Sequence, residues 1–187
     1  MILDRTPIAI SCKCELKDPV GFFRYNSQMS YKIIILAPSC GGKSSLMRYL
    51  REHTDLHIAE TDEEVMKANN GVWPDDELKN KVLVPKTTNE IITRENVIYF
   101  ASYIPTELLQ KAKEKGFKIV TLELPLEVLE KRNEKRMIVE GYDDVSQWFK
   151  GQLDNYQSLA ENHIVGQAIN GNQTVEKVAV EVKKLTQ

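Results

Sequence analysis

The sequence predicts an α/β fold, a three-layer sandwich in which a five-stranded parallel sheet carries helices on both faces. Two observations predict it. From residue 31 onward, short apolar segments alternate with segments of helical periodicity, which is typical of β-α units around a parallel sheet. The segment "YKIIILA" (31–37) is apolar without alternation, as expected of a central strand that is covered on both faces.

The elements follow one another in a regular order. Apolar runs predict strands over residues 31–37, 55–62, 96–104, 117–125 and 164–170. Helical spacing predicts helices over residues 43–53, 106–116, 125–138, 144–163 and 175–185. The first helix carries Leu46, Tyr49 and Leu50 on one face, whereas the second follows Pro105 and stops at Gly116. A "GNQT" turn precedes the last helix.

Residues 1–30 lie outside this pattern. In "IAISCKCEL" apolar residues alternate with polar ones, "KDPVG" is typical of a turn, and "FFRYN" can form a returning strand. We therefore predict an N-terminal β-hairpin extension over residues 1–30 and one α/β domain over residues 31–187.

The composition is that of an ordinary globular protein. Of the 187 residues, 42% are hydrophobic and 28% are charged, and the net charge of -2 argues against a strong DNA-binding protein. The longest apolar run, 33–38, is far shorter than the roughly 20 residues that span a bilayer. The N-terminus also lacks the basic start and apolar stretch of a signal peptide. We predict a cytoplasmic protein without a membrane partner; the sequence does not indicate its oligomeric state.

The segment "APSCGGKS" (37–44) nearly matches GxxxxGK[ST], the Walker A phosphate-binding loop. Ala37 replaces the first glycine, but an alanine adds one methyl group and fits wherever φ is negative. An apolar strand precedes the loop and a helix follows it, which is the arrangement that forms an anion site. The alternative is an ordinary strand-to-helix turn with a surface lysine.

Two stretches resemble the P-loop kinases, the superfamily that includes adenylate, guanylate, shikimate and polynucleotide kinases. "APSCGGKSS" is similar to their "GPSGAGKST" loops, and "LELPLEVLEKRNEKR" (122–136) is similar to their strand and arginine-bearing lid helix. The "KRNEKR" run with the later "DDVSQWFKGQLDNY" most resembles phage-type polynucleotide 5'-hydroxyl kinases. The resemblance implies a P-loop NTPase fold and a kinase domain over residues 31–187, with a lid over 125–145.

The resemblance also implies the residues that hold ATP and Mg²⁺. The nucleotide would be bound by Ser39, Cys40, Gly41, Gly42, Lys43, Ser44 and Ser45. Arg132 and Arg136 are four residues apart, so a helix places both on one face, where guanidinium groups stabilise a transferring phosphoryl group. By resemblance, Arg132 would contact the adenine or the phosphates and Arg136 the transferring phosphate. The alternative is a solvated helix whose glutamates pair with these bases.

A hydroxyl kinase also needs a carboxylate near the acceptor. Ligands of open parallel sheets gather beyond the carboxyl ends of the strands, and the acidic end of "DLHIAETD" (55–62) lies at that edge. We predict Asp62 as the catalytic base, with Glu60 as the second candidate; alternatively Asp62 is a helix N-cap. The third strand ends in Ala101, Ser102 and Tyr103, so the Walker B carboxylate is missing there. We therefore predict Mg²⁺ on Ser44 and Asp62, partly through water.

Residues 63–95 occupy the position of the acceptor-binding insert. Their only arginine is Arg94, which argues against a phosphorylated acceptor held by an arginine clamp, and Trp73 is a candidate for stacking. We predict an ATP-dependent kinase that transfers the γ-phosphate to a hydroxyl of a nucleotide, a nucleic acid or a small metabolite. The alternatives are a nucleoside monophosphate kinase and a nucleotide-binding or ATPase module that is not a kinase.

Overall fold

The computed structural model describes residues 30–187, so the predicted N-terminal hairpin lies, apart from Ser30, outside the described residues. The strands are β1 (Lys32–Leu36), β2 (Ile58–Glu60), β3 (Val97–Ala101), β4 (Lys118–Glu123) and β5 (Gln167–Asn170). The α-helices are α1 (Lys43–His53), α2 (Thr61–Ala68), α3 (Asp76–Leu78), α4 (Val84–Ile91), α5 (Thr106–Glu114), α6 (Leu126–Lys135), α7 (Phe149–Glu161) and α8 (Val175–Lys184). Two π-helical turns, η1 (Lys79–Leu83) and η2 (Arg136–Glu140), and a 3₁₀ turn, η3 (Ser146–Trp148), complete the elements.

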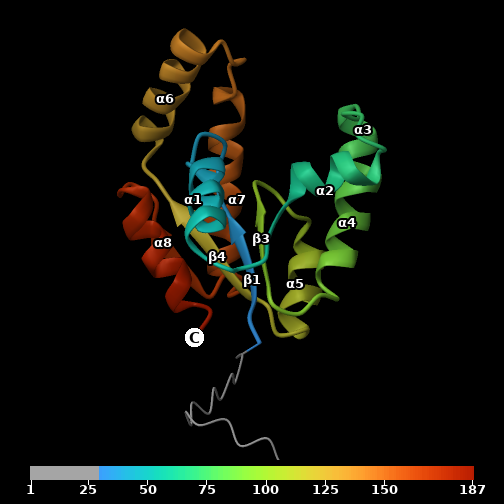
Figure 1. Cartoon of the computed structure of the whole chain (residues 1–187). Helices are drawn as coiled ribbons and strands as arrows, with labels where there is room; N and C mark the ends of the chain where they lie inside the picture. Colours follow the sequence, from blue (N-terminus) through green and yellow to red (C-terminus); the bar gives the residue numbers. More distant parts are fainter. Residues whose placement is uncertain (1–29) are drawn as a thin grey trace, which may run out of the picture.

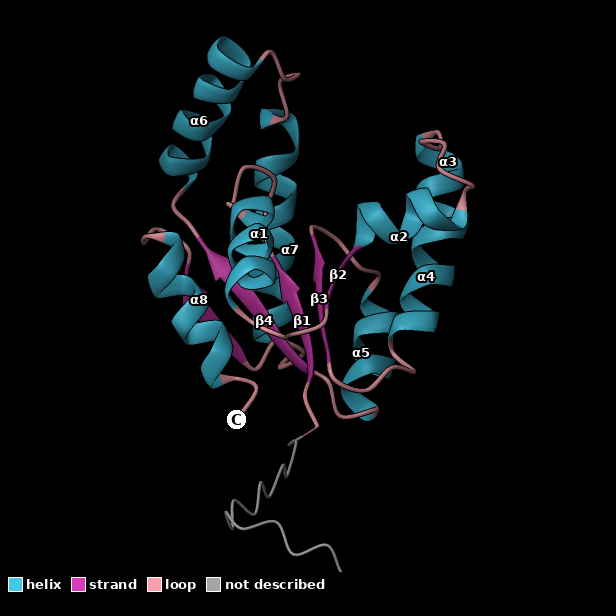
Figure 2. Ribbon diagram, viewed as in Figure 1, coloured by secondary structure: helices cyan, strands magenta, loops and turns pink. Residues whose placement is uncertain are grey.

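The five strands form one parallel sheet in the order β2-β3-β1-β4-β5 (Figure 2). Strand β1 lies at the centre, and its neighbours β3 and β4 pair with it along nearly its whole length. Residues 33–36 are fully buried, as the uninterrupted apolar run predicts. The predicted fold class is confirmed.

Alternate residues of β1 face two separate cores. Ile33 and Ile35 pack with apolar residues of α1 and α8, whereas Ile34 and Leu36 pack with those of α4, α5 and α7. These helices therefore cover the two faces of the sheet and make the three layers, and helices α6 and α3 rise beyond the same end of the sheet (Figure 1). Within the described part of the chain, no helix is both long and apolar enough to cross a membrane.

Several element ends differ from the prediction. The predicted strand 55–62 is shorter, because Glu60 ends β2 and its carboxylate accepts a hydrogen bond from the Glu63 amide at 3.3 Å, which caps α2. Asp62 therefore lies in the first turn of a helix, and the residue that caps the helix is Glu60. The predicted helix 125–138 changes at Arg136 into the π-helical turn η2.

Candidate functional site

The glycine-rich loop joins the central strand β1 to helix α1, at the carboxyl end of the sheet (Figure 1). The Gly41 amide donates a hydrogen bond to the Pro38 carbonyl at 2.9 Å, and the Leu46 amide donates to the Gly42 carbonyl at 3.0 Å. The chain thus turns back tightly and enters α1 at Lys43. The free amides of the first helical turn and the positive end of the helix dipole make this end an anion site.

Two glycines of the loop are required by the backbone. A Cβ on Gly41 would lie 2.7 Å from the Pro38 carbonyl oxygen, and Gly42 has a φ of 89°, which disfavours residues with a side chain. Cys40 also has a positive φ, 59°. Ala37, in contrast, is fully buried and is not among the positive-φ residues, so its methyl group fits where the motif usually has glycine.

Two substitutions in this loop should have effects opposite to those that the motif alone predicts, because Gly41 occupies a variable position of the motif and Ala37 occupies a glycine position. We expect Gly41→Ala to weaken ATP binding by at least about tenfold, because overlap with a backbone oxygen must displace the loop amides. Ala37→Gly, which restores the motif, should change the affinity by less than about threefold. Calorimetric titration with ATP measures both, and equal losses in the two variants would contradict this account of the loop.

Lys43, the first residue of α1, forms an ion pair with Glu60 at the end of β2. Both side chains are largely buried, with 14% of Lys43 and 8% of Glu60 exposed. Glu60 lies in register with Phe100 of β3, one residue before the end of that strand. A carboxylate therefore lies next to the end of β3, on the adjacent strand, and it belongs to Glu60, the second candidate of the sequence prediction.

Asp62 lies on the other side of the β2 end, toward the segment between α2 and α4. Its side chain is 45% exposed and pairs with Lys79 at 2.9 Å. The Lys79 ammonium also lies 4.3 Å from the centre of the Trp73 ring, a cation–π contact. The structure therefore separates the two candidate carboxylates: Glu60 pairs with Lys43, and Asp62 pairs with Lys79 of the segment 63–95, which is predicted to bind the acceptor.

Both predicted arginines reach the loop from α6 and the start of η2. The Arg132 guanidinium donates to the Cys40 carbonyl oxygen and to the Gly171 carbonyl oxygen, each at 3.4 Å. The Arg136 guanidinium lies 3.2 Å from the Cys40 Sγ and stacks over the Tyr142 ring at 4.3 Å. Burial lowers the pKa of Arg132, so an anion bound here would gain a poorly solvated partner.

Gln152 of α7 also contacts the loop, and nothing in the sequence pointed to it. Its Oε1 accepts from the Ser39 amide at 2.8 Å, and its Nε2 donates to the Ser39 Oγ at 3.2 Å. The two residues are 113 positions apart, and a single glutamine in an amphipathic helix carries no motif. Only the tertiary packing brings it to the loop.

Asn133 of α6 is the second residue that sequence reasoning missed. It is 5% exposed, its Nδ2 donates to Asp144 at 2.7 Å, and its Oδ1 accepts from the Val145 amide at 3.3 Å. The Cys40 thiol lies 3.8 Å from the same Oδ1. Asn133 thereby connects the helix that carries both arginines to the segment that leads into α7. An uncharged amide inside the "KRNEKR" run is the one signal that could have singled it out.

The described residues contain no group of three or more histidine, cysteine or acidic side chains that could hold a metal ion by themselves. Ser44 and Glu60, however, line one surface pocket of about 370 Å³ beside α1. A hydroxyl and a carboxylate are oxygen donors that suit Mg²⁺, which commonly keeps several waters and takes phosphate oxygens as further ligands. The donor set therefore fits a Mg²⁺ ion that arrives with a nucleotide.

Comparison with known proteins gives matches only among solved structures: no family model matches the sequence and no curated protein matches it. Shikimate kinase from Acinetobacter baumannii in complex with shikimate matches with a TM-score of 0.66 at 17% identity, over 84% of this chain and 93% of that chain. A gluconokinase from Sinorhizobium meliloti matches with a TM-score of 0.56 at 18% identity, over 85% and 93%. The YorR protein from Bacillus subtilis, in complex with phosphorylated GDP, matches with a TM-score of 0.55 at 19% identity, over 82% and 94%.

These similarities extend over most of each chain, so the chain has the fold of these P-loop kinases, as predicted. At identities below 20% they establish the arrangement of strands and helices and leave the chemistry to be argued from the site. The finer resemblance to phage-type polynucleotide kinases stays a prediction.

Proposed function

We propose that this protein is an ATP- and Mg²⁺-dependent kinase that transfers the γ-phosphate to a hydroxyl group of a small metabolite, a nucleotide or a nucleic acid. The observation that carries the proposal is the convergence of three cations, Lys43, Arg132 and Arg136, on one glycine-rich loop. Structural similarity to enzymes described as shikimate kinase and gluconokinase supports it. The predicted small-metabolite acceptors agree with this similarity.

In this proposal the loop amides and the cations act on the phosphates. Those amides of residues 39–45 that are not bonded to Gln152 or to the Pro38 carbonyl would hold the β- and γ-phosphates, and Lys43 would exchange Glu60 for a phosphate oxygen. Arg132 would contact the adenine or the α- and β-phosphates, and Arg136 would reach the transferring group. Charge on the three equatorial oxygens of that group grows in the transition state, where fixed guanidinium donors stabilise it most.

Mg²⁺ would be held by the Ser44 hydroxyl, by nucleotide phosphate oxygens and by water oriented by Glu60, with Asp62 as a second carboxylate. The ion supplies positive charge that neutralises the β- and γ-phosphates. Glu60 could take this role once a phosphate oxygen has displaced it from Lys43, since its carboxylate already lies at the edge of the loop.

Asp62 would orient the acceptor hydroxyl and accept its proton. The acceptor oxygen forms a bond to the γ-phosphorus, the bond from that phosphorus to the β,γ-bridging oxygen breaks, and ADP leaves. The proton moves from the hydroxyl to the Asp62 carboxylate. The position of Asp62 two residues beyond Glu60, half-exposed and facing the segment 63–95, supports this role.

Removing this carboxylate should affect turnover with little effect on ATP binding. We expect Asp62→Asn to lower kcat for acceptor-dependent ADP formation by roughly 10²–10⁴-fold. Glu63→Gln removes a similarly exposed carboxylate from the same helical turn and is the matched control, with an expected change below about threefold. If the two variants behave alike, or if Asp62→Asn keeps full activity, the base must be sought elsewhere, beginning with Glu60.

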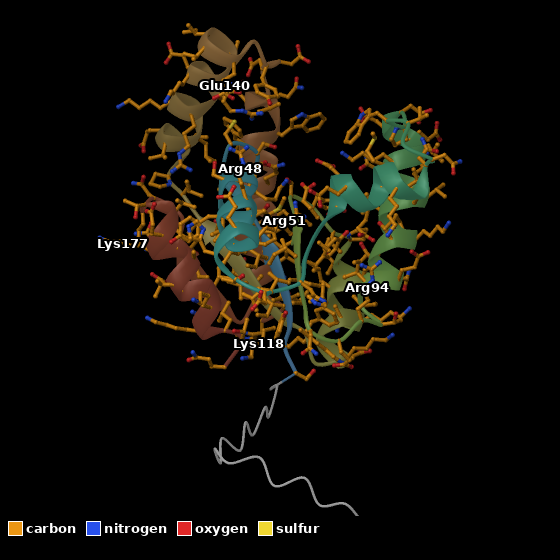
Figure 3. All side chains as sticks on the ribbon, in the orientation of Figure 1. Arg48, Arg51, Arg94, Lys118, Glu140 and Lys177 are labelled. Atoms are coloured by element: carbon orange, nitrogen blue, oxygen red, sulfur yellow. The ribbon has the colours of Figure 1, made fainter. Side chains whose placement is uncertain are left out.

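The nucleoside monophosphate kinase alternative needs arginines for the acceptor phosphate. Arg94, the only arginine of the segment 63–95, is paired with Glu64 at 2.8 Å and lies beyond the end of α4 that is remote from α3 (Figure 3). The remaining alternative, a nucleotide-binding module that is not a kinase, predicts ATP binding without any acceptor-stimulated turnover.

A further inference from the structure

The half-exposed Trp73 has no packing role in the cores of the described residues. The segment between α2 and α4 has its own small core, formed by Val65, Leu83 and Val84, and Trp73 is not part of it. Its side chain is 52% exposed in the turn between α2 and α3. An indole that lies outside the apolar cores and is half-exposed in the predicted acceptor-binding segment has surface available to a ligand.

Trp73 lies next to the predicted catalytic base. The Lys79 ammonium contacts both, because it is 2.9 Å from the Asp62 carboxylate and 4.3 Å from the centre of the Trp73 ring. Lys79 is 20% exposed, so the shared cation that places the two groups near each other is itself mostly buried. One small molecule can therefore lie against the indole and present a hydroxyl to Asp62.

The cation beside Trp73 is already paired with a carboxylate, which disfavours an anionic ligand. Residues 61–95 contain eight acidic and five basic side chains. Three of these bases are already paired: Lys79 with Asp62 at 2.9 Å, Lys81 with Glu77 at 2.8 Å, and Arg94 with Glu64 at 2.8 Å. The cation beside Trp73 is thus neutralised by Asp62, and a phosphate or carboxylate brought there would have to displace Asp62 from Lys79.

We propose that the phosphate acceptor is an uncharged hydroxyl compound whose ring stacks on Trp73, the class to which unphosphorylated nucleosides and simple sugars belong. This inference rests on the proposed kinase function and defines its acceptor side. Trp73 determines acceptor affinity by stacking, and the Asp62–Lys79 pair makes an anionic acceptor unfavourable. Nucleobases and sugar rings share the flat or apolar face that an indole binds, so both sources are tested.

The first test measures binding apart from turnover. Calorimetric titrations with a non-hydrolysable ATP analogue and Mg²⁺ present would use nucleosides, hexoses, the matching nucleoside monophosphates, shikimate and gluconate as probes. We expect a nucleoside or a hexose to bind at least about tenfold more tightly than its phosphorylated or carboxylated counterpart. Preferred binding of any anionic probe, or no binding of any uncharged one, overturns the inference. ADP formation, assayed separately, decides whether the protein is a kinase.

The second test asks whether Trp73 supplies this affinity. Trp73→Ala should weaken binding of the best uncharged probe by roughly 5- to 150-fold, with ATP affinity unchanged, and Trp73→Phe should recover most of it. Val72→Ala, at the adjacent and more exposed position, is the matched control and should change neither affinity. Thermal melting curves establish that the variants fold. Unaltered acceptor binding in Trp73→Ala would overturn the inference.

Discussion

Replacing Lys43 by alanine is expected to lower kcat/KM for ATP by at least roughly 10²–10³-fold, the loss typical of removing one fixed donor to a transferring phosphoryl group. Lys43 begins α1 directly after the glycine turn, so no other side chain of the loop can replace its ammonium. Initial rates of ADP formation at varied ATP concentration measure the loss. An activity within about tenfold of wild type would remove Lys43 from the proposed mechanism.

The effect of Lys43→Ala on stability shows whether the loss of activity reflects a lost contact to ATP or a damaged fold. Because Glu60 is 8% exposed, Lys43→Ala leaves a buried carboxylate without its cation, and we expect a loss of about 3–5 kcal/mol in the free energy of unfolding. The double variant Lys43→Met with Glu60→Gln removes both charges and should recover most of that stability while staying inactive. Denaturant unfolding of the two variants makes the comparison.

The second large effect is expected at Arg136. Arg136→Ala should lower kcat by roughly 10³-fold, because its guanidinium is the one proposed to meet the charge of the transferring group. Lys135→Ala removes the same formal charge from the adjacent exposed position and is the matched control, with an expected change below about threefold. Steady-state kinetics at saturating ATP measure both variants.

Arg132 should differ from Arg136 in which kinetic parameter it affects. Because Arg132 contacts carbonyl oxygens of the loop and of Gly171, its removal should raise KM for ATP more than it lowers kcat.

For Arg136, equal losses of kcat in Lys135→Ala and Arg136→Ala would contradict the proposed role. They would indicate a general charge effect of the helix, as in the alternative of a solvated helix.

Much of the fold could be predicted because its signals are local. Short-range periodicity of apolar residues predicts the buried strand β1, the helix that starts inside the loop and the repeated β-α order. The spacing of Arg132 and Arg136 placed both on one face, and both reach Cys40. Ala37 is not among the positive-φ residues, which agrees with the local argument that only φ and space matter there; its effect on ATP binding stays a prediction.

The parts that could not be predicted depend on contacts between distant segments. Gln152 reaches Ser39 across 113 positions, and Asn133 joins α6 to the start of α7; neither pairing leaves a pattern in the sequence. The end of β2 was misplaced because "AETD" suits both a strand edge and a helix start. In the structure the strand ends at Glu60, because the Glu60 carboxylate caps α2 and pairs with Lys43.

The carboxylate closest to the end of β3 also depends on strand order. The sequence shows no carboxylate at the end of β3, because its apolar run ends in Ala101 and Ser102. In the sheet, β2 lies beside β3, and Glu60 reaches the loop from there. Strand order is a long-range property, so the sequence could nominate Glu60 and Asp62 but could not assign them separate positions.

The most direct measurement of the central claim follows the γ-phosphate itself. Wild-type protein would be mixed with γ-labelled ATP, Mg²⁺ and each acceptor probe, and label would be counted separately in acceptor and in inorganic phosphate, with Lys43→Ala as the blank. The proposed function predicts acceptor-dependent ADP formation, with label on the acceptor hydroxyl in equal amount. Binding of ATP with label appearing only in inorganic phosphate, at a rate that no acceptor changes, would contradict it.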